Sequence, residues 1–315
     1  AICVGPNYDY GVYKANGEYF VMATELAGTS FAAADITDYE LIGTLEGKEL
    51  ELMTTQHPFL DRESLVIVGD HVTLESGTGC VHTAPGFGVD DFEVCRKYPQ
   101  LPMVVSVDAK GICTADAGQF EGLSTDDANK KIAMHLSETG ALFALAKIIH
   151  QYPHCWRCKS PILFRATEQC FCSIKAFADK AVEAIETVKW VPAWGGDRIT
   201  GMVRDRSDWC ISRQLWWGHR IPAFYCDDCG EMTVSKEDIS VCPKCGGKVH
   251  QDPDVLDTWF SSALWPFSTL GWPESTEDLK RYYPTSVLVT GYDIITFWVS
   301  RMIFSGLEHM GEKPF

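Results

Sequence analysis

Four cysteines in two Cys-x-x-Cys pairs constrain the fold more than any other feature of this sequence. The pairs are Cys226/Cys229 and Cys242/Cys245. Thiolates at this spacing bind Zn²⁺ tetrahedrally, and the glycines that follow, Gly230 and Gly246, permit the tight turn that directs both sulfurs of a pair to one ion. Because the protein would supply all four ligands, we predict a closed structural site in a small zinc-ribbon insertion over residues 224–250.

A third pair, Cys155 and Cys158, has no second pair nearby. Its spacing fits a redox dithiol, a chance pair, or half of a zinc site whose other half lies outside the chain. The chain starts at Ala1 with neither an initiating Met nor a signal peptide, so we expect an internal piece of a longer protein and favour the third alternative. The total of 13 cysteines is odd, which favours a reducing compartment, the cytoplasm, over a disulfide scaffold.

Charge and hydropathy exclude two classes of partner. The formal net charge is −16, from 27 basic and 43 acidic residues, so a general polyanion binder is not expected. No run of 18 apolar residues exists, so no membrane partner is expected either. The segment 198–220 is locally basic, with five arginines, which fits either a phosphate contact or a salt-bridged surface.

The hydrophobic pattern predicts a mixed α/β chain with a β-rich first domain, residues 1–148, and a second domain, residues 149–315. Short apolar runs bounded by turn residues predict strands at 18–22, 64–68 and 72–74. Helical spacing predicts amphipathic helices from Ser124 to about Gly140 and from about Ile174 to Val188.

An apolar run, Ser286–Thr290, precedes Gly291 and a long helix with an apolar face. A wholly apolar strand that runs directly into a helix is typical of a parallel sheet covered on both faces, so we predict a buried parallel strand here. The carboxyl edge of such a sheet binds nucleotides, and Gly291 and Asp293 fall at that edge. Trp259 and Trp298 lie beside acidic residues nearby in the sequence, and the pattern alone fits core packing as well as a binding pocket.

The segment from Gly77 to Phe92 is the densest unusual stretch in the first domain. Four glycines and a proline allow the backbone to approach a ligand, and the segment carries His82 and two adjacent carboxylates. Asp90 is placed to cap a helix that begins at Asp91. The alternative is a turn followed by an ordinary N-cap, and no Ser or Cys is paired with the histidine for nucleophilic catalysis.

Long motifs over the whole chain resemble class I aminoacyl-tRNA synthetases for branched aliphatic amino acids. Residues 1 to about 214 resemble the isoleucyl enzymes, and residues from about 215 to 315 resemble the valyl enzymes. The isoleucyl-type motifs are Gly77–Gly86, Tyr152–Cys158, Phe164–Gln169 and Asp205–Gln214; the valyl-type motifs are Leu215–Pro222, Asp254–Pro266 and Thr290–Met302. The resemblance implies an editing domain inserted in a Rossmann-like catalytic domain, of which the chain holds the second half.

The resemblance also assigns residues of an editing site. Asp91 would bind the α-ammonium of a misacylated amino acid, and His82 would line the pocket that admits smaller side chains. The family usually has a second histidine where this chain has Phe87, so part of the hydrogen bonding of the pocket differs.

For synthesis, the resemblance implies that Trp259, Ile294 and Trp298 surround the aliphatic side chain and that Gly291 and Asp293 contact the adenosine of ATP or the adenylate. Mg²⁺ would accompany ATP in the parent enzyme, and tRNA would accept the amino acid. Cys155 and Cys158 match one half of the first zinc site of the family.

The His-Ile-Gly-His and Lys-Met-Ser-Lys-Ser motifs of the family are absent, so the fragment alone should not aminoacylate tRNA. An isoleucyl-type editing site would destroy the product of a valyl-type synthetic site, which indicates a join of the two types near residues 212–216. We favour an isoleucine enzyme, with a valine enzyme as the alternative. A zinc-ribbon module that binds nucleic acid and a free-standing deacylase of mischarged tRNA are the competing functions.

Overall fold

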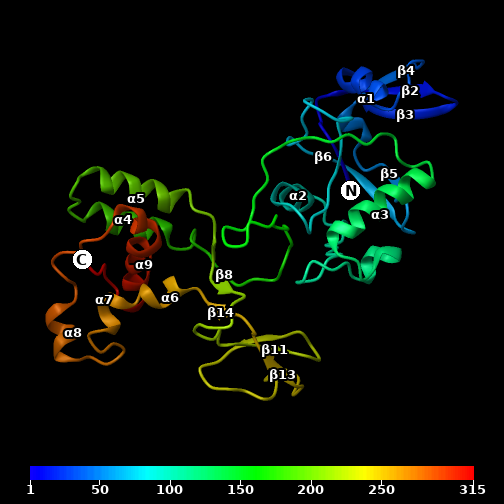
Figure 1. Cartoon of the computed structure of the whole chain (residues 1–315). Helices are drawn as coiled ribbons and strands as arrows, with labels where there is room; N and C mark the ends of the chain where they lie inside the picture. The colour runs from blue at the N-terminus through cyan, green and yellow to red at the C-terminus, as the bar shows by residue number, and fades with distance from the viewer. The chain divides into compact units, whose positions relative to one another are not determined.

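The computed structural model describes all 315 residues and divides into two compact units, Ala1–Thr167 and Glu168–Phe315 (Figure 1). The content is mixed α and β, as the sequence predicts. The functional boundary at residue 148 stays a prediction.

Two sheets form the first unit. The strands β5 (Thr54–Gln56), β6 (Glu63–Val68), β1 (Ile2–Val4) and β7 (Cys80–His82) lie side by side in that order. The second sheet has the order β3 (Glu18–Ala23), β2 (Asp9–Ala15) and β4 (Glu40–Glu46).

The strand predictions at 18–22 and 64–68 are confirmed by β3 and β6. The strand prediction at 72–74 is wrong. The chain turns directly after β6, where the Val72 N–H donates to Gly69 O, and the Val72 side chain is buried beside Cys3 and Ile67. An apolar residue can therefore reach the core from a turn without pairing in a sheet.

The helices of the first unit are α1 (Ala27–Ala33), α2 (Val89–Cys95) and α3 (Thr125–Glu138), with 3₁₀ turns at Thr24–Leu26, Gly47–Leu50 and Ala115–Phe120. The prediction for α3 is confirmed, because the Ser124 hydroxyl accepts the Asp127 N–H at 3.2 Å. The prediction that Asp90 caps a helix is wrong: α2 begins earlier, and the N-cap is Gly88. Asp90 and Asp91 instead occupy the first turn, where negative charge is favourable.

Helices form most of the second unit. They are α4 (Ala178–Glu186), α5 (Trp194–Arg204), α6 (Thr258–Ser262), α7 (Trp265–Ser268), α8 (Glu277–Tyr282) and α9 (Ser300–His309), with a 3₁₀ turn at Tyr292–Ile294 and a π-helical turn at Ile295–Val299. The apolar faces of α4, α5 and α9 share one core around Ile185, Ile199 and Ile303. The predicted helix from Ile174 to Val188 is confirmed as α4, which is shorter at both ends.

The strands of the second unit are short. β8 (Phe171–Cys172) pairs with β9 (Trp209–Cys210), and β10 (Ser212–Arg213) pairs with β14 (Val255–Leu256). The third sheet has the order β12 (Met232–Val234), β11 (Ala223–Cys226) and β13 (Val249–Gln251). Of the four cysteines of the predicted ribbon, Cys226 ends β11, and Cys229, Cys242 and Cys245 lie in the connections between the strands of this sheet.

The predicted parallel strand at Ser286–Thr290 is wrong for this chain. The segment forms no strand, and Val287 and Val289 are 73% and 87% exposed. A parallel strand needs a neighbouring strand on at least one side, and every strand pair of this unit is antiparallel and lies elsewhere. The apolar sequence is therefore present without the sheet that would bury it.

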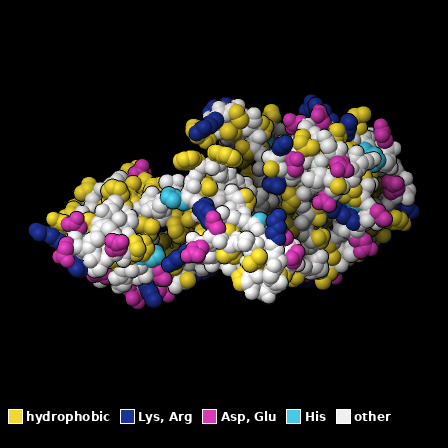
Figure 2. Space-filling view, turned by 90° about the horizontal axis from the view of Figure 1, so that it is seen from below, with side chains coloured by type: hydrophobic (Ala, Val, Ile, Leu, Met, Phe, Trp, Pro, Cys, Tyr) yellow, Lys and Arg dark blue, Asp and Glu magenta, His cyan; other side chains and the backbone are white.

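On the face shown in Figure 2, acidic and basic side chains are interspersed with apolar ones. None of the helices combines the length and the hydrophobicity that a membrane crossing requires.

Candidate functional site

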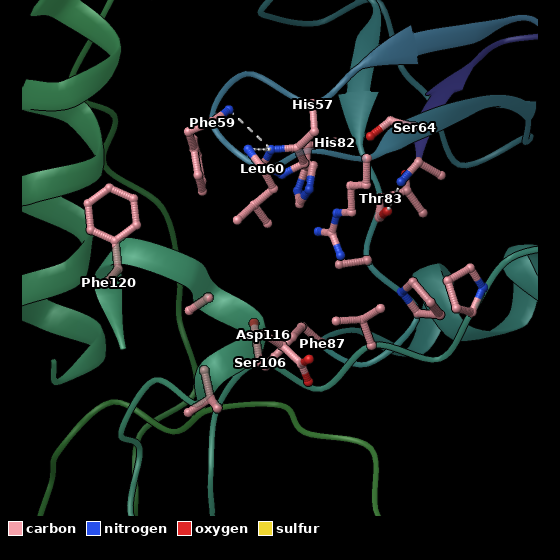
Figure 3. A pocket seen from close by; sticks show the side chains of 18 of the residues that line it. His57, Phe59, Leu60, Ser64, His82, Thr83, Phe87, Ser106, Asp116 and Phe120 are labelled. Atoms are coloured by element: carbon pink, nitrogen blue, oxygen red, sulfur yellow. Dashed lines mark hydrogen bonds between the residues drawn. The ribbon is translucent and has the colours of Figure 1, made fainter. Parts of the chain in front are cut away.

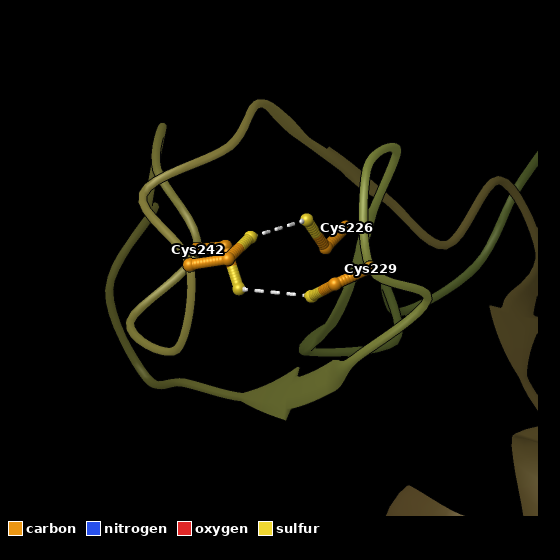
Figure 4. A group of neighbouring side chains, drawn as sticks. Cys226, Cys229 and Cys242 are labelled. Carbon is orange, nitrogen blue, oxygen red and sulfur yellow. Dashed lines mark hydrogen bonds between the residues drawn. The ribbon is translucent and has the colours of Figure 1, made fainter.

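The four predicted zinc ligands converge in the second unit. Their Sγ atoms all lie within 4.8 Å of one another. Cys226 Sγ is 3.4 Å from Cys245 Sγ, and Cys229 Sγ is 3.8 Å from Cys242 Sγ (Figure 4). Four sulfurs this close, two buried and two exposed, form a donor set that suits tetrahedral Zn²⁺.

The same backbone turn builds both halves of this cluster. In the first, the Gly230 N–H donates to Cys226 O at 3.1 Å; in the second, the Gly246 N–H donates to Cys242 O at 2.9 Å. Both glycines have positive φ, 69° and 77°, which L side chains rarely adopt. The glycines are thus required by the turns that direct the sulfurs to one point.

Backbone amides also favour the thiolate form. The N–H groups of Cys245 and Lys244 point to the Cys242 sulfur and lower the pKa of Cys242 to about 7. Since the thiolate is the form that binds metal, Cys242 is suited to an ion near neutral pH, whereas the pKa values of Cys229 and Cys245 are raised and these thiols must lose their protons when an ion binds.

Cys155 and Cys158 form a third turn of the same kind in the first unit. The Lys159 N–H donates to Cys155 O at 2.9 Å, and Lys159 has a φ of 62°. No third Cys, His, Asp or Glu joins this pair to make a cluster. The structure therefore contains one complete four-cysteine cluster and one isolated turn.

A cavity of about 320 Å³ lies in the first unit. His82, from β7, lines it together with His57, which directly follows β5 (Figure 3). Phe87 also lines it, at the position where the resembled family has a second histidine. Apolar side chains, Phe59, Leu60 and Phe120, form much of the remaining wall.

Asp91 lies behind the wall of this cavity and is not one of the residues that line it. Its Oδ1 accepts the Ala84 N–H at 2.8 Å, and Ala84 itself lines the cavity. Desolvation lowers the pKa of His82, and the Asp91 carboxylate opposes this lowering only in part. The structure thus brings the two predicted residues near each other but exposes only His82 to the cavity.

No pattern in the sequence singles out His57. The imidazole Nδ1 accepts the N–H groups of Phe59 at 3.4 Å and Leu60 at 3.1 Å. Desolvation, then Arg62 and His82, lower the pKa of His57. The only local signal was a histidine in a short turn before a predicted strand, and such a signal does not show which cavity the side chain will line.

The predicted amino-acid pocket is partly assembled. Trp298 donates from Nε1 to Ser262 O at 2.9 Å, which ties the π-helical turn to α6. The Trp259 ring, from α6, stacks on Phe297 at a centroid distance of 5.9 Å. Both tryptophans, and Ile294, are half-buried. The two tryptophans therefore come from neighbouring elements, as core packing and a pocket wall would both require.

The residues predicted to contact adenosine are more exposed to solvent than those of the predicted amino-acid pocket. Gly291 and Asp293 are exposed. Gly291 lines a second cavity, of about 910 Å³, together with Trp190 and Tyr292, whereas Asp293 and both predicted tryptophans do not.

Asp257 is a buried carboxylate that holds the start of the helix on which Trp259 lies. Its Oδ2 accepts the indole N–H of Trp209 at 2.8 Å and Nη2 of Arg213 at 2.9 Å, and it is only 5% exposed. Asp257 is also the N-cap of α6, which carries Trp259. This residue joins the start of α6 to the segment 209–213, which lies 44 to 48 residues earlier in the sequence.

Comparison with known proteins agrees with the resemblance of the sequence motifs to class I tRNA synthetases. The family described as tRNA synthetases class I (I, L, M and V) matches residues 12–315. This chain belongs to that family.

The isoleucine--tRNA ligase of Caldicellulosiruptor bescii is 42% identical over 343 aligned positions, which cover 100% of this chain and 37% of the relative. The valine--tRNA ligase of Carboxydothermus hydrogenoformans is 51% identical over 261 positions, which cover 82% of this chain and 30% of the relative. The chain thus spans about a third of the length of these relatives.

A solved structure described as the crystal structure of GlLeuRS-CP1 is 18% identical, with a TM-score of 0.36 over 49% of this chain and 78% of that one. A TM-score this low does not establish a shared fold.

Proposed function

We propose that this chain is part of an isoleucine--tRNA ligase. The parent enzyme activates a branched aliphatic amino acid with ATP and Mg²⁺, transfers it to tRNA, and hydrolyses mischarged tRNA. The observation that carries the proposal is 42% identity to an isoleucine--tRNA ligase across the full chain. All 13 cysteines are free thiols, which supports the cytoplasm as the location.

The cavity of the first unit is the proposed editing site, within an editing domain over residues 1–148. Its volume suits a small aliphatic side chain with its ester, and its apolar wall favours that side chain by removing it from water. His82 contacts the bound substrate. Asp91, held by the Ala84 N–H through one oxygen, has a second oxygen for the substrate ammonium, which must reach it past Ala84 because Asp91 itself does not line the cavity.

In residues 149–315, the proposed catalytic part, Trp259, Ile294 and Trp298 surround the aliphatic side chain. Flat aromatic walls bind such a group through dispersion and buried area. Gly291 and Asp293 contact the adenosine. A hydrophobic pocket separates substrates that differ by one methylene by only about 1–3 kcal/mol, which is why editing accompanies synthesis.

Cys226, Cys229, Cys242 and Cys245 would hold one structural Zn²⁺, which would cross-link the ribbon over residues 224–250. Cys155 and Cys158 would supply half of a second zinc site. The four-sulfur donor set and its shared backbone turns support the first site, and the matching turn at Cys155 supports the second.

The test of the editing site places this chain in a full-length isoleucine--tRNA ligase and replaces Asp91 with Asn. Asn keeps an oxygen for the Ala84 N–H but loses the charge, so hydrolysis of valyl-tRNA should slow by about tenfold or more, the loss of one charge-assisted contact. Asp90→Asn is the matched control, because Asp90 is the neighbouring exposed carboxylate of the same helix turn. Equal hydrolysis by the two variants would contradict the proposal.

A valine--tRNA ligase is the second candidate, favoured by the 51% identity over 82% of the chain. The same full-length protein distinguishes the two. An isoleucine enzyme hydrolyses valyl-tRNA and spares isoleucyl-tRNA, whereas a valine enzyme spares valyl-tRNA.

A further inference from the structure

His57 has its ring orientation fixed from two sides. Nδ1 accepts the backbone N–H groups of Phe59 and Leu60, at 3.4 Å and 3.1 Å. The ring also meets the Phe59 ring edge-on, with centroids 4.6 Å apart. The backbone is held as well, because the His57 N–H donates to Arg62 O at 2.9 Å.

The two bonds to Nδ1 also fix the protonation state. A nitrogen that accepts hydrogen bonds carries no proton, and in a neutral imidazole the proton must then lie on Nε2. The surroundings agree with the neutral form, because desolvation and the nearby positive charge of Arg62 lower the pKa of His57. His57 is therefore a neutral side chain with one free donor, Nε2–H.

This donor has no protein acceptor and belongs to a cavity wall. None of the hydrogen bonds of the chain involves His57 Nε2, whereas Nδ1 takes part in two. His57 lines the same cavity as His82, and Figure 3 shows the two imidazoles beside each other above the open space. A fixed, unpaired donor at the wall of a largely apolar cavity is suited to an acceptor atom of a ligand.

We infer that His57 binds substrate in this cavity through Nε2–H, which donates to an acceptor oxygen of the aminoacyl ester. This inference rests on the proposed editing function. In the hydrolysis, a water oxygen bonds to the carbonyl carbon, the ester C–O bond breaks, and the ribose oxygen receives the proton. His57 keeps its proton throughout, because Nδ1 is occupied and the ring stays neutral.

Two substitutions separate this role from a structural one. His57→Asn places an amide oxygen near the position of Nδ1, so it keeps an acceptor for the Phe59 and Leu60 N–H groups and loses the cavity donor. His57→Gln places an N–H donor near the position of Nε2 and loses the backbone anchor. The matched control is His71→Asn, because His71 lies in the same unit and does not line the cavity.

The experiment is calorimetric titration of the 315-residue chain with adenosine that carries a valyl group in a hydrolysis-resistant amide linkage. The His57→Asn variant should bind about 3- to 10-fold more weakly than the wild type, the value of one hydrogen bond. The His57→Gln variant should lie between the two, and His71→Asn should match the wild type. The reverse order, with Asn unaffected and Gln impaired, would show a purely structural role and overturn the inference.

A second measurement needs no ligand. Nitrogen NMR of the free chain should show the His57 proton on Nε2, and a proton on Nδ1 would overturn the inference. If the wild type and the His57→Asn variant bind the probe equally well, the role of His57 is rejected and the proposed editing site is retained. No binding by the wild type would instead reject the editing site itself, and the inference with it.

Discussion

The turn at Cys155 and the turn at Cys226 have the same backbone geometry but different surroundings. In each turn, the residue four positions after the first cysteine donates its N–H to the carbonyl of that cysteine. This residue is Lys159 in one turn and Gly230 in the other, and both have a positive φ. The Cys226 turn lies at the end of β11, whose pairing with β13 brings it to the turn at Cys242. The Cys155 turn has no such partner. Local sequence thus builds a metal-binding turn, and only strand pairing completes a metal site.

The largest difference expected between the two regions is in metal binding. Cys229→Ser should abolish the bound zinc and unfold the ribbon, since binding of a structural Zn²⁺ contributes about 10 kcal/mol or more to folding. Cys158→Ser, the same position in the isolated turn, should leave about one zinc per chain. Metal analysis and hydrogen exchange over residues 223–251 measure both outcomes. A wild-type chain that is folded and metal-free would contradict the comparison.

The second largest difference between the two regions is expected in the reactivity of their thiols toward alkylation. Backbone and side-chain groups of Ser160 lower the pKa of Cys158, so this exposed thiol should react at a lower pH than an ordinary cysteine. Cys242, whose pKa is about 7, should react only after zinc is removed. Mass spectrometry after iodoacetamide treatment, with and without a chelator, gives the order. Early labelling of Cys242 in the zinc-loaded chain would show that no ion protects it.

A smaller effect is expected from the turn glycine. Gly230→Ala adds a side chain that meets no other atom within 4 Å, so its cost comes only from the φ of 69°. Left-handed backbone costs an L residue roughly 1–2 kcal/mol, and the ribbon should lose that much stability. Chelator competition for zinc measures the loss as weaker binding. Unchanged affinity would mean that the turn can form without a glycine.

The smallest change in stability is expected from the converse substitution, in the isolated turn at Cys155. Lys159 already adopts a φ of 62°, so Lys159→Gly removes that strain and should change stability by no more than about 1 kcal/mol. Denaturant unfolding of the first unit measures it. A large loss would show that the Lys159 side chain, whose ammonium donates to Trp156 O at 2.7 Å, matters more than the backbone.

The predictions that held depended on neighbours in the sequence. The helix that starts after Ser124 follows from its cap and its apolar spacing, and the four-cysteine cluster follows from its two pairs. Asp90 shows the limit of such reasoning, because α2 begins two residues earlier than predicted and its N-cap is Gly88. A boundary of this kind depends on the preceding loop, which the sequence pattern does not describe.

The residues of the candidate sites also differ in whether the sequence alone could identify them. His82, Trp259 and Trp298 could be named from motifs, and the structure places His82 on a cavity wall and the tryptophans on neighbouring elements. His57 could not be named, because its significance depends on two backbone N–H groups and on a cavity formed with β7. Asp257 was missed for a similar reason, since its partners lie 44 and 48 residues away.

By itself, the sequence determined the family, the metal-binding turns, and the helices whose caps and apolar faces are local. Contacts between distant segments decided which turns meet, which residues line the cavity, and that Ser286–Thr290 pairs with no strand and leaves Val287 and Val289 exposed. The physical reason is that a helix or a tight turn satisfies its own backbone hydrogen bonds, whereas a strand, a cavity and a four-ligand site need partners from distant parts of the chain.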